Sequence, residues 1–200
     1  MKQGLLTILK FLLFLLVLPL VVACVLAFQD QFLGVPVHKE QWLLWGIAAY
    51  TILHLFLYDF KEVYGFGRSV VAKIFSFLGP SADMAGAVVP IYAILVICLG
   101  LVLNALGYGA YERLVLFLLA FAAALHVIGT ARQLYESDPS PMKGQYLVSF
   151  GLVLSANLII LAAVIIPLLP EFSFIAFIKS LAHRIAVYYT YVYKVLFIPR

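Results

Sequence analysis

The chain has 200 residues, of which 66% are hydrophobic and 11% are charged; its net charge is +4 and its mean hydropathy is +1.11. Soluble domains are about half apolar and about a quarter charged, and a chain this short has too little interior to hide the excess from water. The composition excludes a soluble fold, and a small charge scattered over short loops excludes a nucleic-acid partner.

Five apolar runs follow one another along the chain. They cover residues 5–28, 41–58, 84–106, 111–131 and 145–169, and each is near the roughly 20 residues that cross the hydrocarbon core as a helix. Glycine and proline separate the runs. We therefore predict an all-α polytopic membrane protein, a single integral membrane domain over residues 1–200, with five transmembrane helices or six if the last segment also crosses.

The first run has two interpretations. Residues 21–24 end in Cys24 and fit the pattern before a lipoprotein cleavage site, with Lys2 and Lys10 as the basic region of a signal peptide. The apolar residues continue past this cysteine to Phe28, which favours an uncleaved first helix. Cleavage at Cys24 stays open at this point.

Basic residues lie mainly on one side of the five runs. Lys2, Lys10, Lys61, Arg68, Lys73, Arg132 and Lys143 share that side, and Lys39 and Arg113 lie opposite. Because positive loops stay in the cytoplasm, we expect a cytoplasmic N-terminus. The chain has no glycosylation sequon, transit sequence or retention signal, so we expect a bacterial inner (plasma) membrane.

The loop after the second run contains an amphipathic segment, residues 66–78. At about 100° per residue its apolar residues fill one half of a helical wheel, and Arg68 and Lys73 lie in the other half. This pattern predicts a helix on the cytoplasmic membrane surface. Arg68 and Lys73 are candidate contacts for lipid headgroups or a partner protein.

The last segment, residues 172–198, is a second amphipathic helix. Lys179, His183, Arg184 and Lys194 fall within an arc of about 140°. The segment either lies flat with this basic stripe toward lipid phosphates, or it is a sixth span. In a span, Lys179 and Arg184 would line a water-filled cavity or meet a partner, because intramembrane charges are costly.

Two histidines inside the runs have a structural and a redox interpretation. His54 and His126 each lie about five residues from the same predicted end of a span, and two imidazoles facing each other at one depth would ligate a b-type haem. The simpler interpretation is that each imidazole bonds a neighbouring carbonyl or hydroxyl between helices.

Signatures of catalysis are missing from the sequence. It contains none of the common nucleotide, metalloprotease or serine hydrolase motifs, and neither cysteine suggests a metal site, so no cofactor or metal is expected. Asp59 and Glu62, with His54 one turn before them, form the one cluster that merits mutation.

These features favour a non-enzymatic subunit of a larger inner-membrane assembly for transport, secretion or lipid trafficking. Such a subunit would contact membrane lipids and other protein chains. The alternative is a small transporter or channel for an anionic substrate or lipid that uses the basic face of the last helix. A haem protein is the third interpretation.

Overall fold

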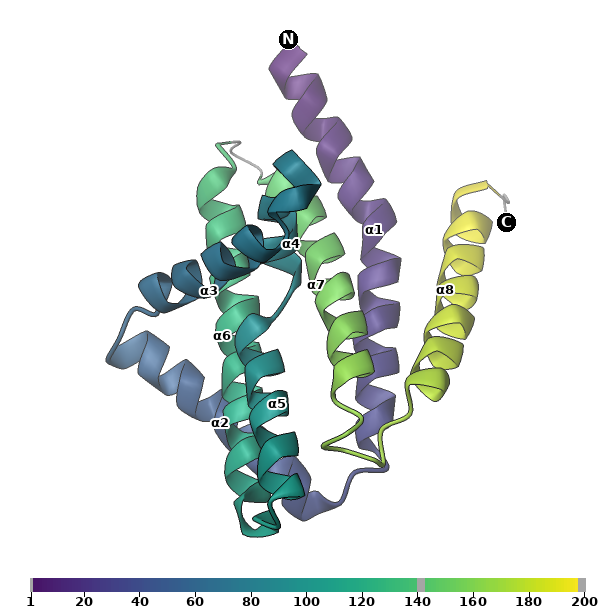
Figure 1. Ribbon diagram of the computed structural model, residues 1–200. Helices are drawn as coiled ribbons and strands as arrows, with labels where there is room; N and C mark the ends of the chain where they lie inside the picture. Colours follow the sequence, from purple (N-terminus) through teal and green to yellow (C-terminus); the bar gives the residue numbers. More distant parts are fainter. Residues whose placement is uncertain (1, 140–142, 198–200) are drawn as a thin grey trace.

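The computed structural model describes residues 2–139 and 143–197, and this part of the chain is helical with no strand (Figure 1). Eight α-helices follow one another: α1 Lys2–Phe32, α2 Val37–Phe56, α3 Lys61–Ile74, α4 Ala82–Val88, α5 Ile91–Ala105, α6 Glu112–Ser137, α7 Gly144–Val164 and α8 Phe174–Phe197. Two short 3-10 turns, Ser76–Ser81 and Gly109–Tyr111, precede α4 and α6.

The long helices pack lengthwise in pairs. α1 lies against α7 and α8, while α6 lies against α2, α5 and α7. The start of α1 and the end of α8 lie at the same end of the bundle (Figure 1). The described segments therefore run up and down between two ends, which is the arrangement of a helical membrane bundle.

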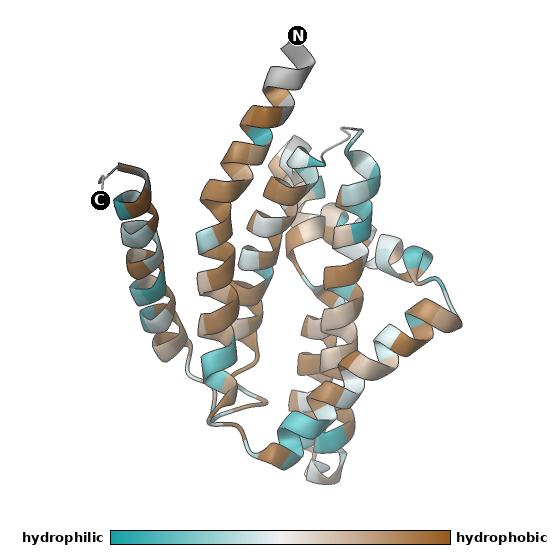
Figure 2. Cartoon of the chain, turned by 180° about the vertical axis from the view of Figure 1, so that it is seen from behind, coloured by the Kyte–Doolittle hydropathy of each residue, from teal (hydrophilic) through white to brown (hydrophobic). Residues whose placement is uncertain are grey.

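Length and composition support membrane crossing for part of this bundle. Three stretches are each long and apolar enough to span, Ile8–Phe32, Gly109–Ser137 and Gly144–Val164. Two bent pairs of helices, α2 with α3 and α4 with α5, are long and apolar enough when each pair is taken as one span. The described chain then has up to five spans. Hydrophilic residues gather toward the bundle ends and along α3 (Figure 2).

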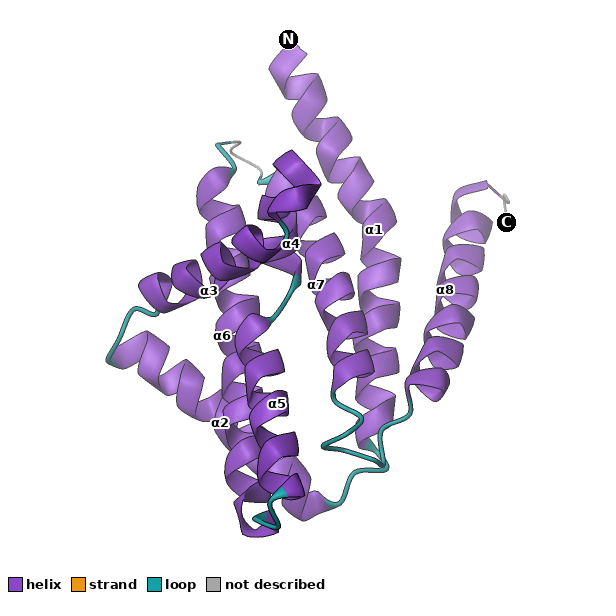
Figure 3. Cartoon of the chain, in the orientation of Figure 1, coloured by secondary structure: helices purple, strands orange, loops and turns teal. Residues whose placement is uncertain are grey.

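The third predicted span, residues 84–106, is broken in the structure. α4 ends at Val88 and α5 begins at Ile91, with an angle of 59° between them (Figure 3). Pro90 causes the break because it lacks the N–H that a continuous helix requires. The fifth predicted span, residues 145–169, also proves shorter, since α7 ends at Val164 before Pro167.

α3 runs across the direction of the long helices and is bent by 119° from α2 (Figure 1). The predicted amphipathic helix at residues 66–78 thus exists, but it starts earlier, at Lys61, and gives way to a 3-10 turn at Ser76. Its apolar side is partly exposed: Phe66 and Ile74 are 68% and 59% accessible, whereas Val71 is buried. The opposite side carries polar residues.

α8 is a continuous helix that lies lengthwise beside α1 (Figure 1). It packs on α1 through buried Phe177 and Leu181, and the Tyr189 hydroxyl donates a hydrogen bond of 2.7 Å to the Leu16 carbonyl. α8 is not one of the helices that are long and apolar enough to span a membrane by themselves. Whether it crosses the bilayer stays a prediction.

Cys24 lies in the packed interface between α1 and α7. The residue is fully buried, and its thiol is 3.5 Å from the carbonyl oxygen of Ser155. α1 continues without interruption through this position. The uncleaved first helix stays a prediction.

Candidate functional site

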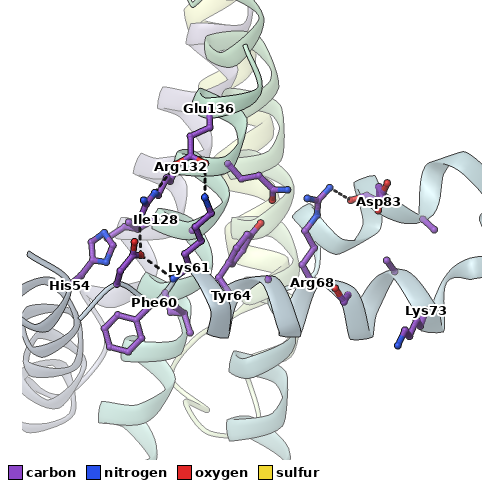
Figure 4. A pocket seen from close by; sticks show the side chains of 18 of the residues that line it. His54, Phe60, Lys61, Tyr64, Arg68, Lys73, Asp83, Ile128, Arg132 and Glu136 are labelled. Atoms are coloured by element: carbon purple, nitrogen blue, oxygen red, sulfur yellow. Dashed lines mark hydrogen bonds and ion pairs between the residues drawn. The ribbon is translucent and has the colours of Figure 1, made fainter. Parts of the chain in front are cut away.

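The candidate site is a charged pocket of about 710 Å³ between the end of α2, α3, the start of α4 and the last turns of α6 (Figure 4). A volume of this size is within the range of small-ligand sites, about 300–1,000 Å³. Its charged lining residues are Asp59, Lys61, Arg68, Lys73, Asp83, Arg132 and Glu136, joined by His54, Tyr50 and Tyr64.

One end of the charged pocket holds an ion-pair network. Arg132 donates hydrogen bonds to Asp59 at 2.6 Å and Glu136 at 2.9 Å, and Lys61 lies 3.3 Å from Glu136. The Arg132 hydrogen bond holds the pKa of Asp59 below its ordinary value. Two cations and two carboxylates thus neutralise each other at this end.

Arg68 and Lys73 have no carboxylate partner among the described residues. In the case of Arg68, the guanidinium is only weakly bound to the protein. Its Nη2 makes one long hydrogen bond, 3.4 Å, to the backbone carbonyl of Asp83. Its Nε is buried and has no hydrogen-bond partner within the described residues. Burying an unpaired donor costs about 1–3 kcal/mol, and the one long bond of the Nη2 atom leaves the guanidinium without an ion pair to offset its charge.

A second unpaired nitrogen belongs to His54 on α2. The imidazole stacks on the ring of Tyr50 with 5.5 Å between centroids, and its Nδ1 is buried with no partner in the described part of the chain. A guanidinium and an imidazole on the walls of one pocket, with Lys73 farther along α3 (Figure 4), are typical of sites that bind phosphate or carboxylate oxygens.

Tyr64 forms the inner wall between these groups. Its hydroxyl shares a 2.9 Å hydrogen bond with the Thr130 hydroxyl, and its ring lies directly over Gly129, where any Cβ would come within 2.5 Å of the ring. The close approach of α3 to α6 therefore depends on glycine at this position.

His126 has a structural role beneath this wall. Because Pro90 has no N–H and the Ile91 N–H bonds Val89, the carbonyl of Ala87 is free of helix partners. His126 Nε2 lies 3.0 Å from that oxygen, and the Thr130 hydroxyl lies 3.4 Å from it. The prediction that this imidazole bonds a neighbouring carbonyl is confirmed.

The structure does not bring His54 and His126 together. His54 stacks on Tyr50, whereas His126 packs beside Tyr64, and none of the ring contacts described joins the two imidazoles. Nε2 of His126 faces a carbonyl oxygen, so the haem interpretation has no facing pair of ligands. No group of three or more potential metal ligands occurs within residues 2–139 and 143–197.

The predicted basic stripe of α8 is divided. Arg184 turns toward α1, where its guanidinium binds both carboxylate oxygens of Asp30 at 2.8 and 3.0 Å and the Ser180 hydroxyl donates to the same carboxylate. Lys179, His183 and Lys194 are exposed instead. The four residues do not form one surface, because Arg184 already has its counter-ion inside the chain.

Two of the predicted contact residues, Arg68 and Lys73, line the charged pocket, as do His54 and Asp59. Glu62 is exposed and lies outside it. Sequence reasoning missed the inner wall of Tyr64 and Gly129 and the role of Arg132. The spacing of Arg132 and Glu136, four residues apart on one helix, was the available signal for the ion network.

The chain matches no protein-family profile, no curated protein and no solved structure. The function of the charged pocket is therefore inferred from its own geometry.

Proposed function

We propose that this protein is a membrane-embedded, non-enzymatic protein that binds an oxyanion, such as a phosphate group, in the charged pocket. The observation that carries the proposal is the guanidinium of Arg68, which lines the pocket and has no carboxylate partner among the described residues. An anion beside this guanidinium would gain charge-assisted hydrogen bonds from a cation that has no ion pair within the described chain.

The position of α3 supports this proposal. About 200° around the helix axis separates Phe66 from Arg68, so an apolar side and a pocket side lie on opposite faces of one helix. An amphipathic helix of this kind lies in the interface, its apolar side toward the acyl chains. The charged pocket then lies at the level of headgroup phosphates.

The same placement suits a role in transport or lipid handling within an inner-membrane assembly. Arg68, Lys73 and Arg132 lie in the half of the bundle nearer the start of α1 (Figures 1 and 4). With the excess of positive loops on that side, a cytoplasmic N-terminus places the charged pocket at the cytoplasmic surface.

Binding of orthophosphate tests the proposal. Protein in an uncharged detergent is titrated with orthophosphate, and binding is followed by calorimetry at low salt. We expect Arg68→Gln to weaken binding at least tenfold and Lys73→Gln to weaken it several-fold. Lys179→Gln removes an equal charge at an exposed position of α8 and should leave the orthophosphate affinity unchanged. Equal affinity of Arg68→Gln and the parent protein would refute the proposal.

We also propose that the protein is a subunit of a larger assembly and contacts other protein chains through α8. It is favoured by the exposure of Lys179, His183 and Lys194 on α8, none of which has a polar partner within the described chain. Extraction in mild detergent followed by native mass measurement tests it. We expect the parent protein to have the mass of a heteromeric complex and the double variant Lys179→Glu, Lys194→Glu to have the mass of the single chain. A single-chain mass for the parent protein as well would contradict the proposal.

A further inference from the structure

A second cavity, here called the lateral groove, lies between the α1–α7 pair and the α2–α6 pair. Its volume is about 560 Å³. The lining is apolar apart from Gln29 and Glu40, and small residues of α6 widen it. These residues are Ala120, Ala123 and Ala124.

The lateral groove adjoins the charged pocket. Ile128 lines both cavities (labelled in Figure 4). Along α2, Leu44 and Ile47 line the groove, and the next turns, with Tyr50 and His54, line the pocket. On both α2 and α6, the residues that line the charged pocket come later in the helix than most of those that line the groove. On α6 the two sets lie on different faces of the helix, with Ile128 at the boundary where the cavities meet.

We propose that one anionic phospholipid occupies both cavities, with its phosphate beside Arg68 and one acyl chain in the lateral groove. The inference rests on the proposed function, since it names the source of the bound oxyanion. The order of polarity along the two cavities matches such a ligand: a charged group, then hydrocarbon. A free phosphate would use the charged pocket and leave the groove unexplained.

The size of the groove favours an acyl chain over a partner helix. A helix with side chains is about 10 Å across, so a volume of about 560 Å³ would hold only about 7 Å of it, little more than one turn. An acyl chain is much thinner and fits lengthwise. The groove is also formed by helices that can span the membrane, where hydrocarbon is the surrounding solvent.

Photo-crosslinking in nanodiscs tests the proposal. The probe is phosphatidylglycerol with a diazirine halfway along one acyl chain; the neutral control is diacylglycerol with the same chain. We expect phosphatidylglycerol to label groove-lining peptides at least fivefold more than diacylglycerol does. Arg68→Gln should remove most of this difference. Equal labelling by the two lipids would overturn the proposal, because the acyl chain would then bind in the groove without any contribution from the phosphate headgroup.

Two matched tryptophan variants of α2 complete the experiment. Leu44 lines the groove and Leu55 lines neither cavity, yet both are well exposed, at 57% and 68%. Leu44→Trp should lower groove labelling at least fivefold without changing orthophosphate affinity, and Leu55→Trp should change neither. Equal loss in both variants would overturn the acyl-chain site.

The two proposals fail separately. Orthophosphate binding that depends on Arg68, without lipid labelling of the groove, would overturn the lipid inference and leave the oxyanion site standing. Loss of both signals would overturn both.

Discussion

Gly129 lies under the ring of Tyr64, and this contact holds α3 against α6 at the inner wall of the charged pocket. A Cβ at residue 129 would lie 2.5 Å from that ring, so Gly129→Ala must displace Tyr64 and its hydrogen bond to Thr130. Overpacking of this kind costs about 1–3 kcal/mol. We expect a lower free energy of unfolding and weaker orthophosphate binding, measured by SDS titration and calorimetry.

Gly65 is the matched control for this substitution. A Cβ on Gly65 meets no atom within 4 Å, and alanine is favoured over glycine in a helix by about 1 kcal/mol. Gly65→Ala should therefore raise the free energy of unfolding slightly. If both alanine variants behaved alike, the proposed contact of Gly129 with Tyr64 would be wrong.

Asp59 makes part of the stability depend on pH. It lies between α2 and α3, and the Arg132 hydrogen bond lowers its pKa in the folded protein. A carboxylate with a lowered pKa stabilises the fold above its unfolded pKa, about 3.9, and loses this effect as the pH falls through the folded value. We expect the Tm in detergent to be level between about pH 7 and pH 5 and to fall below about pH 4.

Two carboxylate variants show whether Asp59 causes that fall. Asp59→Asn should lower the Tm near neutral pH and make its decrease in acid smaller, since one of the ion-paired carboxylates is gone. Glu62→Gln removes an exposed carboxylate outside the charged pocket and should keep the parent profile. An unchanged acid decrease in Asp59→Asn would contradict the assignment.

At the scale of elements, α8 is held to the bundle mainly through α1, and the charged contact between them in the described part of the chain is Arg184 with Asp30. Hydrogen bonds to charged groups contribute about 1.5–3 kcal/mol. Arg184→Ala and Asp30→Ala should each lower the free energy of unfolding by about that amount, and the exchange Asp30→Arg with Arg184→Asp should recover part of it. Lys179→Ala should change it by less than about 0.5 kcal/mol; a loss equal to that of Arg184→Ala would refute the pairing.

The sequence predicted elements better than contacts. Apolar runs predicted the long helices because lipid exposure leaves a strong, local signal, and the amphipathic pattern around Phe66 predicted α3. The third predicted span is present as a bent pair of helices, because Pro90 interrupts the helix within the apolar run. The ion pairs between helices could not be predicted from the sequence. Asp30 and Arg184 are 154 residues apart, and Asp59 and Arg132 are 73 residues apart. A single sequence does not show which of such distant charges meet.

For the whole molecule, the pairing of Arg184 bears on membrane topology. α8 has 24 residues, about 36 Å as a helix, and it runs antiparallel to α1 (Figure 1). Its central charge is neutralised by Asp30. Lys179 and Lys194 lie near the two ends of α8, where a lysine side chain can extend to the interface. These features favour a sixth crossing over a helix that lies flat.

Accessibility of single cysteines decides between the two placements. The exposed native thiol is first removed by Cys98→Ala, and a membrane-impermeant maleimide is applied to right-side-out and inverted vesicles. Ser137 ends α6 and Val195 lies near the end of α8, so Ser137→Cys and Val195→Cys should react from one side of the membrane, while Ser173→Cys, just before α8, should react from the other. A flat α8 would instead expose Val195→Cys on the side of Ser173→Cys, and the charge-neutralised crossing would be wrong.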